Sequence, residues 1–148
     1  MAKATQRQIV ATLTPVSQAG HSTGPSFGQA RYFSTVSGGE ISASVEKVYD
    51  GGSTFPQVLC APAEIGDITM TMFYDPDVDG DRLNQLRQLV GQVYYDVNVF
   101  TLDCDLQVPG TERVYSKSLL VGLTEPDGDA SSGTPAQFSL TFSVSTVA

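Results

Sequence analysis

The chain has 148 residues and a formal net charge of -8 at pH 7, from 16 acidic and 8 basic residues. A surface that grips nucleic acid needs clustered Lys and Arg, and the basic residues here are scattered, which argues against specific nucleic-acid binding. The length predicts a single domain over residues 1–148 that can bury about 70% of its unfolded surface.

No apolar run is long enough to cross a membrane, and the first residues lack the apolar centre of a signal peptide. We therefore expect synthesis in the cytoplasm and no membrane insertion by this chain. The two cysteines, Cys60 and Cys104, have neither the spacing nor the context that demands a disulfide. We expect both to be reduced and partly buried.

The N-terminal region predicts one strand and then a long loop. Thr5–Thr14 alternates apolar and polar residues, which is typical of a strand. Residues 15–39 are punctuated by Gly, Pro and Ser, and a loop of more than about 15 residues in a compact domain is usually functional or disordered. Its aromatic residues, Phe27, Tyr32 and Phe33, are not typical of a linker, although the last two could instead begin the next strand.

The next segments read mainly as strands. Glu40–Asp50 alternates and predicts a strand with one wet face. The glycines at 51 and 52 predict a turn, and Phe55–Cys60 a short irregular strand. Glu64–Tyr74 is the clearest strand of a sheet interior. Its inward residues are predicted to be Ile68, Met70, Met72 and Tyr74.

A single short helix is predicted from about Asp81 to Val90, because apolar residues recur there at helical spacing. Asp79 or Asp81 could cap its first turn, since a short carboxylate accepts hydrogen bonds from free backbone N–H groups. Gly91 stands where helices commonly end in a left-handed residue.

The turn before this helix contains part of a calcium-loop pattern. Asp75, Asp77, Asp79 and Gly80 match the first half of D-x-D-x-D-G. The twelfth position of such a loop should be a bidentate Glu and is Leu86. A strand-to-helix turn rich in capping residues is the favoured interpretation, and a metal site at the three aspartates stays a weak candidate.

The C-terminal half predicts three further strands. Residues 93–102 and 112–123 alternate and are expected to pair as a hairpin. A second long polar loop follows at about 124–135. The last strand is expected to place Phe138, Leu140, Phe142 and Val144 inside.

No set of catalytic or ligating residues emerges. The only histidine, His21, lies among loop serines with no visible orienting group, so a nucleophilic triad is not supported. One His and two distant Cys cannot supply a zinc site. Asp103 and Asp105 share one face of a strand, but no apolar pocket is evident that would raise either pKa for glycoside hydrolysis. We expect neither enzymatic activity nor a cofactor.

Three pieces together resemble the tail tube (major tail) proteins of long-tailed, siphovirus-like bacteriophages. They are the strand Glu64–Tyr74 with its acidic turn, the short helix directly after it, and the closing strand Phe138–Val147. The order of elements covers nearly the whole chain. The resemblance implies a mainly β subunit, a β-sandwich or barrel with one short α-helix, of the phage tail-tube type. Contractile-tail tubes and secretion-system tubes are the most similar alternatives.

The resemblance further implies stacked, hexameric rings in the virion tail, assembled in the host cytoplasm. DNA would pass through without specific binding, a tape measure protein would lie inside, and other tail proteins would bind the tube ends. The net negative charge has the sign that repels DNA from a channel wall. Contacts between subunits are expected from the first long loop, at Phe27, Arg31, Tyr32 and Phe33. Acidic or polar residues facing the lumen are expected at Glu40, Glu46, Asp103 and Asp105.

Two other classes remain open. One is a β-sandwich that binds partners at a surface, with calcium at the Asp-rich turn as one version. The other is a β-barrel enzyme of unidentified chemistry.

Overall fold

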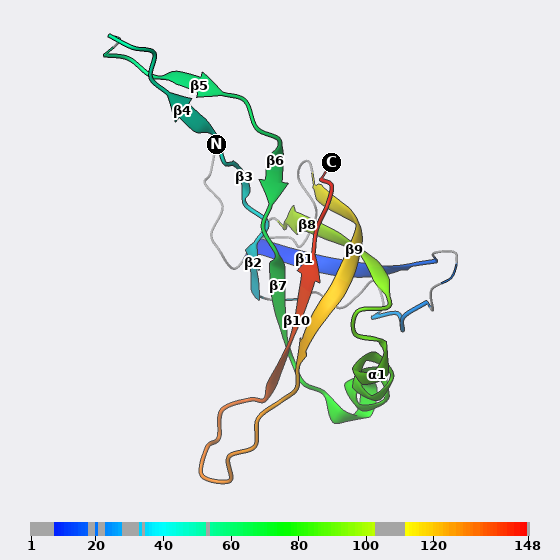
Figure 1. Ribbon diagram of the computed structural model, residues 1–148. Helices are drawn as coiled ribbons and strands as arrows, with labels where there is room; N and C mark the ends of the chain where they lie inside the picture. The colour runs from blue at the N-terminus through cyan, green and yellow to red at the C-terminus, as the bar shows by residue number, and fades with distance from the viewer. Residues whose placement is uncertain are drawn as a thin grey trace.

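The computed structural model describes residues 8–17, 20, 23–27, 33, 35–52, 54–102 and 112–147. Within them the chain forms ten strands and one helix (Figure 1). In chain order they are β1 (Ile9–Val16), β2 (Thr35–Gly38), β3 (Ile41–Ala43), β4 (Glu46–Val48), β5 (Gln57–Leu59), β6 (Ala63–Ile65), β7 (Ile68–Phe73), α1 (Pro76–Leu89), β8 (Tyr94–Thr101), β9 (Arg113–Thr124) and β10 (Gln137–Ser143).

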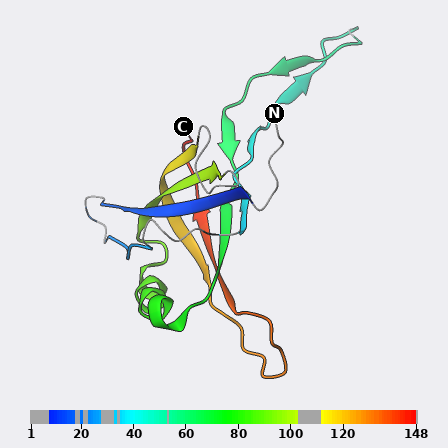
Figure 2. The ribbon, with the colours of Figure 1, turned by 180° about the vertical axis from the view of Figure 1, so that it is seen from behind.

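Six of the strands form one antiparallel sheet in the order β1-β8-β9-β10-β7-β2. The sheet is curled, and β1 runs across β7 and β10, behind them in the view of Figure 1 and in front of them in Figure 2. Its two edges meet through a bridge between Ala11 and Phe33, whose backbone groups exchange hydrogen bonds of 3.3 and 2.8 Å. This contact closes the sheet toward a barrel, so neither edge strand is left wholly unpaired.

The core fills the inner face of this curled sheet. The alternation of β7 is confirmed, because Ile68, Met70 and Met72 are buried while Thr69 and Thr71 are only half-buried. The final strand is confirmed in the same way. The largest fully buried side chains are Tyr95, Tyr115, Phe27, Phe33, Phe138, Phe142, Ile68, Met70, Leu86, Leu120, Leu140 and Val93.

The helix is longer than predicted and starts earlier. It begins at Pro76, where a missing N–H and a fixed φ suit the first helical position, and Asp75 is its N-cap. The prediction that Asp79 or Asp81 caps the helix is therefore wrong, because Pro76 favours the first helical position and moves the start of the helix ahead of both residues. At the other end Gly91 has φ +83°, which confirms the left-handed residue after the helix.

The first predicted loop is also interrupted by structure. β2 occupies Thr35–Gly38 inside the range 15–39, and it pairs with β7. Phe33 already pairs with Ala11, as the alternative interpretation of this aromatic allowed. Pairing with a neighbouring strand outweighs the weak strand propensity of a Ser- and Gly-containing segment.

β3 to β6 build a thin ribbon that projects from the barrel, which we call the arm (residues 40–66). β3 pairs with β6 and β4 pairs with β5, each pair over three residues. Figures 1 and 2 show the arm extending from one end of the molecule, with α1 and the β9–β10 connection at the other end. The predicted strand Glu40–Asp50 is in fact two short strands, and both of its faces are exposed. Cys60 lies in the arm and is exposed, so its predicted partial burial is wrong.

The C-terminal half follows the prediction closely. β8 and β9 pair as expected, with a register shift between Tyr95 and Val97. The second polar loop lies between Thr124 and Gln137. In the part of the chain that the structure describes, no helix is long and apolar enough to cross a membrane.

Candidate assembly surfaces

The base of the arm is shaped by glycines. Gly38 has φ +94°, and a Cβ atom there would lie 2.0 Å from the carbonyl oxygen of Asp67. Only glycine accommodates both this dihedral angle and this close approach. The backbone N–H of Gly66 donates a 2.8 Å hydrogen bond to the carbonyl of Glu40. The outgoing and returning segments of the arm therefore leave the barrel side by side.

The arm carries most of the exposed large apolar side chains of the described residues. Phe55 at its tip is 83% exposed, and Tyr49 across the turn is 62% exposed. The full set in the arm is Ile41, Val45, Val48, Tyr49, Phe55, Val58 and Leu59. Several exposed large apolar side chains on one thin element mark a site of interaction with another molecule. A two-stranded ribbon is also only marginally stable alone in water, which gives the same indication.

The sequence contains a local signal for this surface. Val48 and Tyr49 precede the glycine turn at 51 and 52, and Phe55 follows it. Apolar residues on both sides of a hairpin turn predict a hairpin with an apolar tip. Alternation alone assigned one wet face to this segment, because alternation identifies a strand without showing what covers it.

The aromatic residues assigned to subunit contacts lie instead in the core. Phe27 is 1% exposed and Phe33 is 0% exposed. The Phe27 ring lies 5.6 Å from that of Phe33 and 6.5 Å from that of Phe138, as measured between centroids. These two rings are therefore intrachain contacts, which corrects their interpretation as surface aromatics. Arg31 and Tyr32 lie outside the described residues.

The segment 23–27, which carries Phe27, is held against the barrel by polar contacts as well. The Tyr95 hydroxyl donates a 2.7 Å hydrogen bond to the carbonyl of Pro25. Burial raises the pKa of Tyr95 above its ordinary value, and the nearby positive charge of Arg82 partly opposes this shift. The guanidinium of Arg82 lies 5.5 Å from the centroid of the Phe27 ring, a cation–π distance.

The three candidate metal ligands take part in the start of the helix. The Asp75 carboxylate accepts from the backbone N–H of Asp77 at 3.2 Å. Asp79 is fully buried, and its carboxylate accepts from the N–H of Asp75 at 3.0 Å and lies 3.6 Å from Arg82. Among the described residues no group of three or more His, Cys, Asp or Glu side chains could hold a metal ion. The turn therefore has the geometry of a helix N-cap.

Of the four candidate lumen residues, two lie in the arm. Glu40 stands at its base and Glu46 in β4, and both are exposed. Asp103 and Asp105 lie outside the described residues. The structure does not bring Glu40 and Glu46 into a shared acidic site.

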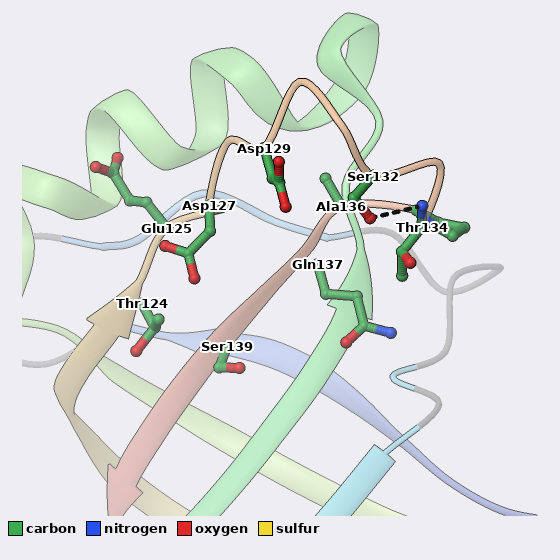
Figure 3. A pocket seen from close by; sticks show the side chains of 10 residues that line it. Thr124, Glu125, Asp127, Asp129, Ser132, Thr134, Ala136, Gln137 and Ser139 are labelled. Carbon is green, nitrogen blue, oxygen red and sulfur yellow. Dashed lines mark hydrogen bonds between the residues drawn. The ribbon is translucent and has the colours of Figure 1, made fainter.

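A further acidic concavity lies inside the β9–β10 connection (Figure 3). It encloses about 530 Å³ and is lined by Glu125, Asp127 and Asp129 together with hydroxyl-bearing residues. Hydrogen bonds from the Ser131 hydroxyl and N–H hold the pKa of Asp129 below its ordinary value. The bond between the N–H of Thr134 and the Ser132 hydroxyl, 3.2 Å, keeps the loop compact. These contacts order the loop itself.

Comparison with solved structures identifies the type of fold. A chain from the 6-fold symmetrised baseplate of the anti-feeding prophage superposes with a TM-score of 0.70 at 18% identity, over 100% of this chain and 95% of that chain. A chain from the sheath–tube complex of PVC, an extracellular contractile injection system, gives 0.69 at 19% identity, over 99% and 90%. Hcp1 from Flavobacterium johnsoniae gives 0.50 at 14% identity, over 94% and 93%.

At these identities the likeness shows the fold alone. The fold is mainly β with one helix and is tail-tube-like, which confirms the predicted fold class. The PVC particle is described as an extracellular contractile injection system, whereas the sequence resemblance is to the tubes of long-tailed phages. No family model matches the sequence. No curated protein matches it either.

Proposed function

We propose that this chain is a structural subunit of a tube in a phage-tail-like particle, in which copies form rings and the rings stack. The observation that carries the proposal is the exposed apolar arm on a tail-tube-like fold. An arm at one end of a subunit that binds a different surface on the next copy makes a head-to-tail contact. Contacts of that kind produce rings where the rotation between copies closes and open, growing stacks where it does not, rather than two-fold dimers.

Sixfold rings are part of the proposal, supported by the 6-fold symmetry of the particle that contains one matched chain. Matches to chains from a PVC sheath/tube terminator and from the anti-feeding prophage cap favour a tube that is built together with other proteins at its ends. A contractile injection tube is favoured over the tube of a long-tailed phage, since two of the matched chains come from an extracellular contractile injection system. The role is structural and not enzymatic, and its place is the tail of the particle.

The proposed contents of the tube follow from the same interpretation. A tape measure protein would occupy the channel during assembly, and a cargo such as DNA would later pass through without specific binding. The scattered basic residues and the net charge of -8 are consistent with passage rather than capture.

The test is assembly of the purified full chain, followed by negative-stain electron microscopy and sedimentation as its concentration is raised. We expect rings or tubes. Phe55→Asp should abolish them, because a charge at the arm tip would have to be desolvated in the contact. Phe55→Leu keeps an apolar tip and is the matched control that should still assemble.

Two results would overturn the proposal. If the parent chain remained monomeric at every concentration, it would not be a tube subunit. If Phe55→Asp assembled as the parent does, the arm would not be the contact between copies.

A further inference from the structure

The outer face of three neighbouring strands is built almost entirely of hydroxyl side chains. In the order of the sheet, Thr35 of β2 pairs with Thr71 of β7, and Thr71 pairs with Ser139 of β10. The next row runs through Ser37, Thr69 and Thr141 in the same way. We call these six residues the hydroxyl face.

This face is uncharged in a chain that is otherwise rich in carboxylates. β2, β7 and β10 contain no Asp, Glu, Lys, Arg or His at any position. The chain as a whole has 16 acidic residues and a net charge of -8. The carboxylates described above lie in the arm, in the turn that starts α1, and in the β9–β10 connection. Those of the connection (Glu125, Asp127 and Asp129) line the same concavity as Ser139, so they border the hydroxyl face only at its Ser139 end.

Four of the six hydroxyl groups are paired with one another within the face. The Thr71 and Ser139 hydroxyl oxygens are 3.0 Å apart, and those of Thr69 and Thr141 are 3.5 Å apart. Covering them with another subunit would remove their remaining hydration with little apolar area gained in return. The exposed apolar side chains that favour association lie mainly in the arm, and only Phe73 and Val121 border this face. The hydroxyl face therefore suits contact with water better than contact with protein.

We infer that in the assembled tube the hydroxyl face lines the channel and makes its wall electrically neutral over these strands. The inference rests on the proposed function and specifies which surface of the subunit the cargo would meet in the channel. Short hydroxyl side chains bind water and offer no fixed charge, so a hydrated macromolecule passes without selection by the sign of its charge. This differs from the acidic wall that the net charge suggested.

Maleimide labelling of assembled tubes tests the inference. The parent is Cys60→Ser/Cys104→Ser, and Thr141→Cys and Thr71→Cys are each added to it. In tubes, a small neutral maleimide should react, because the channel is hydrated and open along its length. A maleimide coupled to a folded protein should not react. As unassembled subunits, the same variants should react with both reagents.

The charge of the channel wall is measured with the same variants, from their rates of reaction with a cationic and an anionic small maleimide. A neutral wall predicts that the ratio of their rates in tubes stays close to the ratio in unassembled subunits. An acidic wall would raise the preference for the cationic reagent by about tenfold or more, since a channel of one sign concentrates counter-ions. That result would overturn the neutral wall.

The outcomes separate this inference from the proposed function. If the parent forms tubes but the cysteine variants do not, or if tubes block the small reagent, the face is an interface and the inference fails alone. If the protein-coupled reagent labels tubes, the face lies outside and the inference again fails alone. If the parent forms no tubes, both fail.

Discussion

The barrel and the arm have similar sequence patterns and opposite environments. In β7 the alternate residues Ile68, Met70 and Met72 are almost completely buried. In β3 and the residues after it, Ile41 and Val45 also alternate with polar residues, yet they are 60% and 44% exposed. The difference is what lies over the apolar face: a curled sheet and a helix cover the first, and nothing among the described residues covers the second. Alternation reports strand geometry, whereas burial depends on distant parts of the chain or on another chain.

The largest expected effect is loss of a barrel residue that the sequence assigned to the surface. Phe27→Ala should lower the free energy of unfolding by about 3–5 kcal/mol, because a fully buried aromatic ring is lost and a cavity is left. Urea denaturation of the unassembled subunit measures it. A change below about 1 kcal/mol, the range of surface substitutions, would return Phe27 to the surface and weaken the contrast with the arm.

Two adjacent residues of α1, one buried and one exposed, provide the same contrast. Leu86 is 0% exposed, and Leu86→Ala should cost about 2–5 kcal/mol. Arg87 is an exposed neighbour that forms an ion pair with Glu125, so Arg87→Ala should cost no more than about 1 kcal/mol. Equal losses in thermal unfolding would mean that the buried face of α1 is misassigned.

The same contrast explains which parts of the fold the sequence predicts correctly and which it does not. Long alternating strands such as β7, β8 and β10 were placed correctly, because their own side chains cover one another across the sheet. The position of Phe27 was not predicted, because its burial comes from contacts with Phe33 and with Phe138 of β10, and the residues next to Phe27 in the sequence indicate neither contact. The alternation of the arm predicts an ordinary strand, because alternation does not show whether an apolar face is covered by its own chain or by another. Only the apolar residues around the glycine turn indicate the exposed tip.

A smaller effect is expected at the junction between barrel and helix. Asp75→Ala removes the side-chain acceptor of the N-cap and should lower the free energy of unfolding by about 0.5–2 kcal/mol, as measured by urea denaturation.

A chelator should leave the melting temperature of the parent unchanged. A ligand that binds only the folded state stabilises it, so the removal of a bound cation would lower the melting temperature. A large chelator-dependent fall would instead make the turn a cation site.

The contact between Tyr95 and Pro25 should have a measurable dependence on alkaline pH. Tyr95→Phe loses one hydrogen bond and should cost about 0.5–1.5 kcal/mol at neutral pH. Because the folded state raises the pKa of Tyr95, its contribution is complete below the unfolded tyrosine value of about 10 and is lost as pH rises above it. The parent should therefore lose stability above that pH more steeply than Tyr95→Phe. Parallel curves would show that Tyr95 ionises as freely in the folded chain as in the unfolded one.

The smallest expected effect lies in the arm. Phe55 is 83% exposed, so Phe55→Ser removes little buried area and should change the free energy of unfolding of the unassembled subunit by less than about 0.5 kcal/mol. Phe27→Ala, measured at the same protein concentration, is the buried counterpart. A loss of several kcal/mol in Phe55→Ser would mean that the arm folds onto its own barrel in solution. The apolar face of the arm would then be covered by its own chain, and the distinction drawn between the two regions would disappear.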